Sequence, residues 1–192
     1  MIQLSRNPKT WLTIFIIGGL CGALCDQIHV QGQVLWYAIP ALAGQAWWVA
    51  PLFGGASLLM YVAASLWAPY AERLSPAAVS NGEIARQFLW FVAMYALSAG
   101  MQQKPLWLCV LYAVLLVRRM LRRRDIAAQL VNAAGLAVGG TAFEMALTST
   151  GAFSYRAPDV LGVPMWLPGL YLHGAPLAMA VVRRIRQTER NM

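Results

Sequence analysis

The stretch WLTIFIIGGLCGALC, residues 11–25, carries no charged side chain and is apolar along nearly its whole length. With the residues that flank it, the stretch approaches the roughly 20 apolar residues that a helix needs to cross a bilayer. Arg6 and Lys9 precede it, as in the basic region of a signal peptide, but no small-residue cleavage site followed by a soluble chain appears. We therefore interpret residues 11–29 as a retained first membrane helix.

The composition of the whole chain also indicates an integral membrane protein. Of its 192 residues, 59% are hydrophobic and 11% are charged, whereas a soluble domain carries roughly 25% charged residues. The net charge of +8 does not predict nucleic-acid binding, because the basic residues flank apolar runs instead of forming a patch on a soluble face. Cys21, Cys25 and Cys109 lack the paired spacing of a zinc site, and we expect ordinary packing for them.

The apolar runs predict an all-α membrane protein with a single domain, residues 1–192, built as one bundle of six transmembrane helices. The expected spans are residues 11–29, 46–67, 86–101, 105–121, 126–148 and 164–182. The third and fourth spans are shorter than about 20 residues and only QQKP separates them, so a re-entrant pair is the alternative. No internal repeat stands out.

The basic residues orient this bundle. If the N-terminus is cytoplasmic, every Lys and Arg except Lys104 and Arg156 falls on the cytoplasmic side. The cytoplasmic set includes the run from Arg118 to Arg124, with Arg122 in it. Because cytoplasmic loops carry an excess of Lys and Arg, we predict that both termini are cytoplasmic and that residues 151–168 face the other side.

Two glycine pairs, Gly18 with Gly22 and Gly135 with Gly139, have the spacing that lets membrane helices approach closely. We expect them to serve tight packing within one bundle rather than dimerisation.

Charged groups within the spans are the candidate functional residues, because they are costly in a membrane. Asp26 lies near the outer end of the first span with His29 one turn later, and Glu144 lies inside the fifth. For Asp26 and His29 we favour internal hydrogen bonding that fixes the bundle, and for Asp26 also simple placement at the interface. For Glu144 a structural and a functional role are equally supported, since a neutral carboxyl can donate a hydrogen bond. No motif predicts a catalytic residue, a metal ligand or a cofactor.

Four segments resemble the Insig family. They are AWWVAPLFGGAS (46–57), ALSAG (96–100), GAFSYRAPDV (151–160) with the following MWLP, and more faintly LCDQIHV (24–30). The resemblance implies a six-helix protein that binds oxysterols within the membrane and retains a sterol-sensing escort protein. Gln102 stands where that family carries an acidic residue tied to escort release, and Glu144 stands where it has an uncharged polar one. We therefore expect a compact, bacterial-type homologue in the inner membrane (the endoplasmic reticulum, if eukaryotic), without the escort function.

The function expected from this resemblance is binding of a sterol-like lipid or glycerolipid between the helices, in a sensor or regulatory role. A homo-oligomer and a membrane-protein partner are further expectations; nucleic acid is not expected. The candidate lipid-binding residues are Glu144, Thr141, Thr148, Asp26, Gln27, Trp48, Tyr155 and Trp166.

An enzyme is the less favoured alternative. FEMALTSTGAFSY (143–155) is similar to a pattern of carotenoid hydratases, in which Glu144 would protonate a polyene. A transporter is less favoured still, because no inverted repeat is seen.

Residues 151–168 are predicted to form an ordered lid at the outer mouth of the bundle. Their three prolines restrict the backbone, and Asp159 is placed to cap a turn. The alternative is plain anchoring of Phe153, Tyr155 and Trp166 in the membrane interface.

Overall fold

The computed structural model describes residues 4–121 and 123–191, so Arg122 of the basic run lies outside the described residues. The elements are α1 (Pro8–Gln31), β1 (Leu35–Tyr37), α2 (Val49–Leu74), α3 (Asn81–Met101), α4 (Pro105–Met120), α5 (Ile126–Ser149), β2 (Phe153–Tyr155), α6 (Leu167–Leu172) and α7 (Ala175–Arg190). The fold is thus a helical bundle with one small two-stranded sheet.

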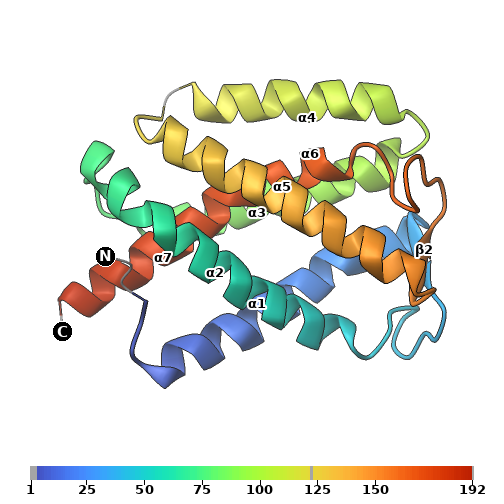
Figure 1. Ribbon diagram of the computed structural model, residues 1–192, viewed down its shortest axis with the longest axis horizontal. Coiled ribbons are helices and arrows are strands. Elements are labelled where there is room, and N and C mark those ends of the chain that lie inside the picture. The colour runs from blue at the N-terminus through green and yellow to red at the C-terminus, as the bar shows by residue number, and fades with distance from the viewer. Residues whose placement is uncertain (1–3, 122, 192) are drawn as a thin grey trace.

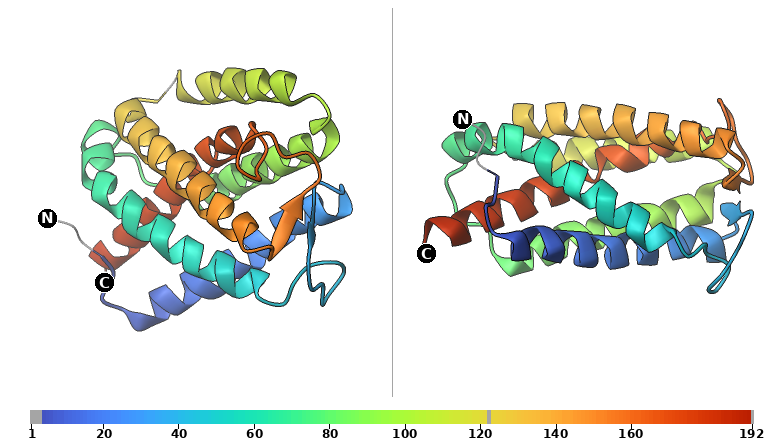
Figure 2. Two further views of the ribbon diagram at one scale, coloured as in Figure 1. Left: turned by 45° about the vertical axis from the view of Figure 1, so that its right-hand side comes forward. Right: turned by 60° about the horizontal axis from the view of Figure 1, so that its bottom comes forward.

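The helices run between two ends of the molecule. Both termini and the connection from α4 to α5 lie at one end, whereas β1, β2 and their loops lie at the other (Figure 1). Two further views keep the same division (Figure 2). We call these the terminal end and the sheet end.

Three helices are long and apolar enough to cross a membrane: α1, α2 and α5. At 1.5 Å per residue, the 24 residues of α1 extend about 36 Å, more than the roughly 30 Å of a bilayer core. Large apolar side chains on the outside of the bundle, such as Leu24 (66% exposed) and Val138 (73% exposed), suit a lipid environment. The chain is therefore an integral membrane protein.

The predicted sixth span is interrupted. The structure has α6 and α7 in its place, with His173 and Gly174 between them. Pro176 lies in the first turn of α7 and has no N–H to donate to the carbonyl of Leu172, so one helical hydrogen bond cannot form there. For this reason, the segment does not continue as one helix.

The two ends of the chain fold in the same order, which the sequence analysis did not anticipate. Each element of the second half starts 118 residues after its counterpart, as from Pro8 of α1 to Ile126 of α5. Helices α1 and α5 are both 24 residues long. The same offset separates β1 from β2, and α2 from α6. The expectation that the chain has no repeat is therefore wrong. The hairpin of α3 and α4 lies between the two halves.

The repeat extends to the loop that follows each strand. The backbone turns through positive φ angles at Ala43 (49°) and Gly44 (85°), and again at Leu161 (48°) and Gly162 (83°). Each loop also closes with the same isolated bridge, Leu42 with Gln45 in the first and Val160 with Val163 in the second. The sequence carries this repeat as Tyr-x-x-Pro-x-x-x-Gly-x-x-x-Trp, once at residues 37–48 and once at residues 155–166.

The sheet joins the two halves symmetrically. Strands β1 and β2 are antiparallel, and Trp36 at the centre of β1 pairs with Ser154, its own counterpart, at the centre of β2. A pseudo-twofold axis therefore passes through this pair. Because α1 and α5 both run from the terminal end to the sheet end (Figure 1), the repeat is parallel and not inverted.

The glycine pairs differ in their surroundings. A Cβ on Gly18 would lie 2.4 Å from the Cβ of Ser57, and one on Gly22 would lie 2.4 Å from the Cγ of Phe53, so α1 and α2 approach as predicted. Among the described residues, no heavy atom lies within 4 Å of a Cβ built on Gly135 or Gly139. The prediction of tight internal packing is therefore wrong for that pair.

In α5 it is Gly140 that makes the close contact, because a Cβ there would lie 2.6 Å from the ring of Tyr171. Gly140 is the counterpart of Gly22, and Tyr171 is the counterpart of Phe53. The spacing of the glycines identified a stripe of small residues, but not which side of the helix faces a neighbour.

Candidate functional site

Asp26 occupies a buried position on α1 near the sheet end. Only 5% of the residue is exposed. Its Oδ2 atom accepts hydrogen bonds from the Tyr37 hydroxyl (2.7 Å) and from Nε2 of Gln45 (2.7 Å). The chain reverses at Gln33, which has a φ of 53°, and β1 then brings Tyr37 back beside the helix. The internal hydrogen bonding expected for Asp26 is therefore confirmed, and its placement at the depth of the membrane interface stays a prediction.

Glu144 occupies the corresponding position on α5. Its Oε2 accepts a hydrogen bond from the Tyr155 hydroxyl, and its Oε1 accepts one from the Tyr171 hydroxyl. Glu144 and Tyr155 are the counterparts of Asp26 and Tyr37, with the same 11-residue separation. We call these two acid–tyrosine sites the Asp26 site and the Glu144 site. Each helix of the repeat thus holds its acid against a tyrosine of the strand that follows it.

The two sites are joined by Phe153, whose ring centroid lies 5.8 Å from that of Tyr37 and 5.6 Å from that of Tyr155. Aromatic rings fill the region around them. The ring of Tyr37 packs edge-on against Trp48 at 5.3 Å between centroids, and Tyr155 packs edge-on against Trp166 at 6.3 Å. Hydrogen bonds to both acids offset part of the free-energy cost of placing carboxyls among membrane helices.

The remaining candidates divide between this region and its edges. Thr141 lies one turn before Glu144 and is buried, and its Oγ1 has no hydrogen-bond partner among the described residues. Thr148 instead donates to the carbonyl of Met145 (3.0 Å). Gln27 points toward the outer loop and donates to the carbonyl of Ala43 (2.9 Å). The structure therefore brings Glu144 and Asp26 together with Tyr155, Trp48 and Trp166, but Gln27 and Thr148 lie at the edges.

Two further polar contacts cross the bundle. His29 is buried, and its Nε2 lies 2.7 Å from the hydroxyl of Ser98 on α3, which confirms the expected internal hydrogen bonding. His173, at the break between α6 and α7, contacts Arg119 of α4 through Nδ1 (2.8 Å). Sequence reasoning missed Tyr37 and Tyr171 as partners of the two acids, and only the repeat with its offset of 118 could have indicated the first of them.

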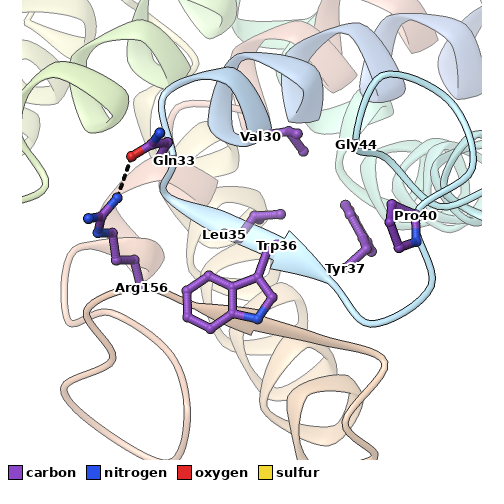
Figure 3. A pocket seen from close by; sticks show the side chains of 8 residues that line it. All are labelled: Val30, Gln33, Leu35, Trp36, Tyr37, Pro40, Gly44 and Arg156. Carbon is purple, nitrogen blue, oxygen red and sulfur yellow. Dashed lines mark hydrogen bonds between the residues drawn. The ribbon is translucent and has the colours of Figure 1, made fainter.

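A groove lies on the outer side of β1. Its volume is about 460 Å³. Trp36, Tyr37 and Pro40 line it, and Arg156 contacts Gln33 across one end (Figure 3). Tyr37 thus belongs both to this groove and to the Asp26 site. In residues 4–121 and 123–191, no cluster of His, Cys, Asp and Glu could hold a metal ion.

The loop of residues 151–168 is ordered by hydrogen bonds. β2 pairs with β1, and Oδ2 of Asp159 accepts from the N–H of Met165 (2.8 Å). Phe153, Tyr155 and Trp166 are all buried, so the alternative in which they anchor the loop in the membrane interface is wrong. Its role as a lid stays a prediction.

Comparison with known proteins supports the resemblance seen in the sequence. No protein-family model and no curated protein matches the chain. Two crystal structures share the fold. A cross-linked trimer of MvINS superposes with a TM-score of 0.74 at 21% identity, over 94% of this chain and 95% of that one. A second structure of MvINS, a mycobacterial Insig homologue from Mycobacterium vanbaalenii, gives a TM-score of 0.72 at 19% identity over the same shares. This chain therefore shares the fold of the mycobacterial Insig homologue.

Proposed function

We propose that this protein binds a lipid between its helices, with the polar end of the lipid at the acid–tyrosine sites, and acts as a sensor or regulatory binding protein. The observation that carries the proposal is the pair of carboxyls, Asp26 (buried) and Glu144 (half-buried), held by tyrosines among membrane helices. Intramembrane acids are expensive and mark functional sites by default. The unpartnered hydroxyl of Thr141, one turn from Glu144, offers a further polar contact.

Native mass spectrometry of gently purified protein tests lipid binding. We expect a stoichiometric lipid in the wild type, retained in Glu144→Gln because an amide still forms hydrogen bonds, and weakened in Glu144→Leu. Lipid binding is compared only between variants that have equal melting temperatures, so that loss of the fold is not mistaken for loss of the site. A protein that retains no lipid, and binds none that is offered, would contradict the proposal.

We further propose six crossings with both termini cytoplasmic, in a bacterial inner membrane and as one domain. The terminal end carries the basic residues at the starts and ends of the helices, such as Arg73, Arg118 and Arg190. Cysteines introduced at Arg118 and Arg156 in a variant without native cysteines should react with a membrane-impermeant thiol reagent from opposite sides. Labelling of both from one side would exclude this topology.

A homo-oligomer also belongs to the proposal. The MvINS structure is a trimer, and the face of α5 with Gly135 and Gly139 leaves room for a second copy in this chain. Leucine at both positions should shift the mass measured by light scattering in detergent toward the monomer. An unchanged mass would place the interface elsewhere.

Intramembrane acid catalysis, the alternative, predicts a different result. Glu144 would protonate a double bond, and turnover of an added carotenoid would disappear in Glu144→Gln. The structure supports this alternative less, because both oxygens of Glu144 already accept hydrogen bonds from tyrosines.

A further inference from the structure

The two acid–tyrosine sites differ in the number of carboxyl oxygens that have a partner. At the Glu144 site, Tyr155 bonds to one oxygen and Tyr171 to the other. At the Asp26 site, both donors bond to Oδ2, and Oδ1 has no hydrogen-bond partner among the described residues. Asp26 is nevertheless 95% buried, being 5% exposed. Oδ1 is not one of the fully buried side-chain atoms that lack a partner, so this oxygen keeps some accessible surface that a ligand could contact.

The missing donor can be identified from the repeat. Tyr171 is the second donor at the Glu144 site, and its ring packs against Gly140, one turn before Glu144. Its counterpart Phe53 packs in the same way against Gly22, one turn before Asp26. The ring is therefore kept in both halves, whereas the hydroxyl that reaches the acid exists in only one.

Gln45 does not replace this hydroxyl. Its Nε2 donates to Oδ2 of Asp26, the atom that Tyr37 already contacts, and also to the carbonyl of Ala23 (3.0 Å). Its counterpart, Val163, has no polar side chain. Gln45 thus steadies Asp26 from one side and leaves Oδ1 free.

We propose that Oδ1 of Asp26, beside Phe53, binds the hydroxyl of an apolar ligand in the place that the Tyr171 hydroxyl fills at the Glu144 site. A hydroxyl suits either state of the acid, because it donates to a carboxylate and accepts from a carboxylic acid. The aromatic surroundings of Phe53 and Trp48 suit an apolar body. Tyr37 links this position to the outer groove. The ligand class is a neutral lipid or other apolar molecule with a free hydroxyl.

This inference rests on the proposed lipid binding and names the protein atom that binds the ligand hydroxyl. Oleyl alcohol and its methyl ether are the probes, since the ether keeps the chain but cannot donate a hydrogen bond. We expect purified, delipidated protein to bind the alcohol at least tenfold more tightly than the ether. Phe53→Tyr should reduce binding of the alcohol at least tenfold, because the new phenol takes its place. Phe143→Tyr, on the exposed face of α5, is the matched control and should leave binding unchanged.

The reverse change tests the same idea without adding bulk. Tyr171→Phe removes the internal hydroxyl from the Glu144 site, and we expect a second equivalent of alcohol to bind. All variants must melt within a few degrees of the wild type. Equal binding of alcohol and ether, or full binding in Phe53→Tyr, would overturn this inference while leaving lipid binding intact. If neither probe nor native lipid binds the wild type, the proposed function fails with it.

Discussion

The first half of the chain, α1 to α2, and the second, α5 to α7, share a backbone plan but treat their buried acids differently. The Glu144 site is closed by two tyrosine hydroxyls, whereas the Asp26 site keeps one oxygen open. A repeat preserves geometry because packing demands it, as the glycine beneath each aromatic ring shows. Side-chain chemistry can then change at single atoms without disturbing the fold. This difference between the halves is the basis of the ligand position that we propose.

The halves also differ in the continuity of their second helix. α2 is one helix, although the break between α6 and α7 corresponds to its residues 55 and 56. Leu58 of α2, the counterpart of Pro176, has an N–H and can keep the helical hydrogen bond. Pro176 thus accompanies the break between α6 and α7, whereas α2 stays one helix even through Pro69 in its interior.

The largest effect should come from the glycine beneath each ring. The Cβ of Gly22→Ala would lie 2.4 Å from Phe53, and the Cβ of Gly140→Ala would lie 2.6 Å from Tyr171. We expect about 2–3 kcal/mol of destabilisation from overpacking in each variant. Gly55→Ala, whose Cβ meets open space, is the matched control and should be neutral or stabilising. Melting temperatures in detergent measure all three. Destabilisation of only one half would show that the two contacts are not equivalent.

The next effect tests the strand tyrosine that each site contains, Tyr37 at the Asp26 site and Tyr155 at the Glu144 site. Tyr37→Phe and Tyr155→Phe each remove one hydrogen bond to a carboxyl, and we expect a loss of roughly 1–2 kcal/mol from each. Unfolding in sodium dodecyl sulfate should show similar losses for the two variants. A much larger loss at Tyr37 would indicate that Asp26 depends on its single tyrosine more than Glu144 depends on its two.

A smaller effect should follow from making the halves alike at Gln45. Gln45→Val copies Val163 and leaves Asp26 with Tyr37 as its partner, at a cost of about 1 kcal/mol. Val163→Gln is the reverse change, and it should give no gain because both oxygens of Glu144 are already occupied. A stabilised Val163→Gln variant would contradict the view that the Glu144 site is closed. The same unfolding assay applies.

The smallest effect concerns the residues that precede α1 and α5, Asn7 and Asp125. Burial alone would raise the pKa of Asp125, but hydrogen bonds from Arg123 and Gln129 outweigh it and hold the pKa below its usual value. The unfolded chain therefore takes up the proton at a higher pH than the native one. Stability from this site is complete above about pH 4 and is lost as the pH falls further. Asp125→Asn, which copies Asn7, should weaken this dependence between pH 5 and pH 3, and an unchanged pH profile would exclude the effect.

Much of the fold could be predicted from the sequence, because apolar runs identify helices directly. Five predicted spans correspond to α1 through α5 within a few residues at most ends. The sixth corresponds to α6 and α7 together, and its apolar run does not indicate the break between them beside Pro176. The repeat was overlooked because its identical residues, such as Tyr37 and Tyr155, lie 118 positions apart among dissimilar neighbours.

The candidate site was predictable only in part. A carboxyl in an apolar run is visible in the sequence, so Asp26 and Glu144 could be named. Their partners could not, because a tyrosine reaches an acid 11 residues earlier only after the chain has reversed. The open oxygen of Asp26 depends on which of two atoms a donor meets, and no sequence pattern specifies that.

The local pairing of each acid has a consequence for biosynthesis. The partners of Asp26 lie within 19 residues after it, and those of Glu144 lie within 27. A newly inserted half can therefore shield its own carboxyl as soon as its next helix begins to enter the bilayer, before the other half has been translated. The sheet, by contrast, forms only after β2 has been made. A ribosome delivering this protein to the membrane thus never leaves Asp26 or Glu144 waiting for a partner from the other half of the chain.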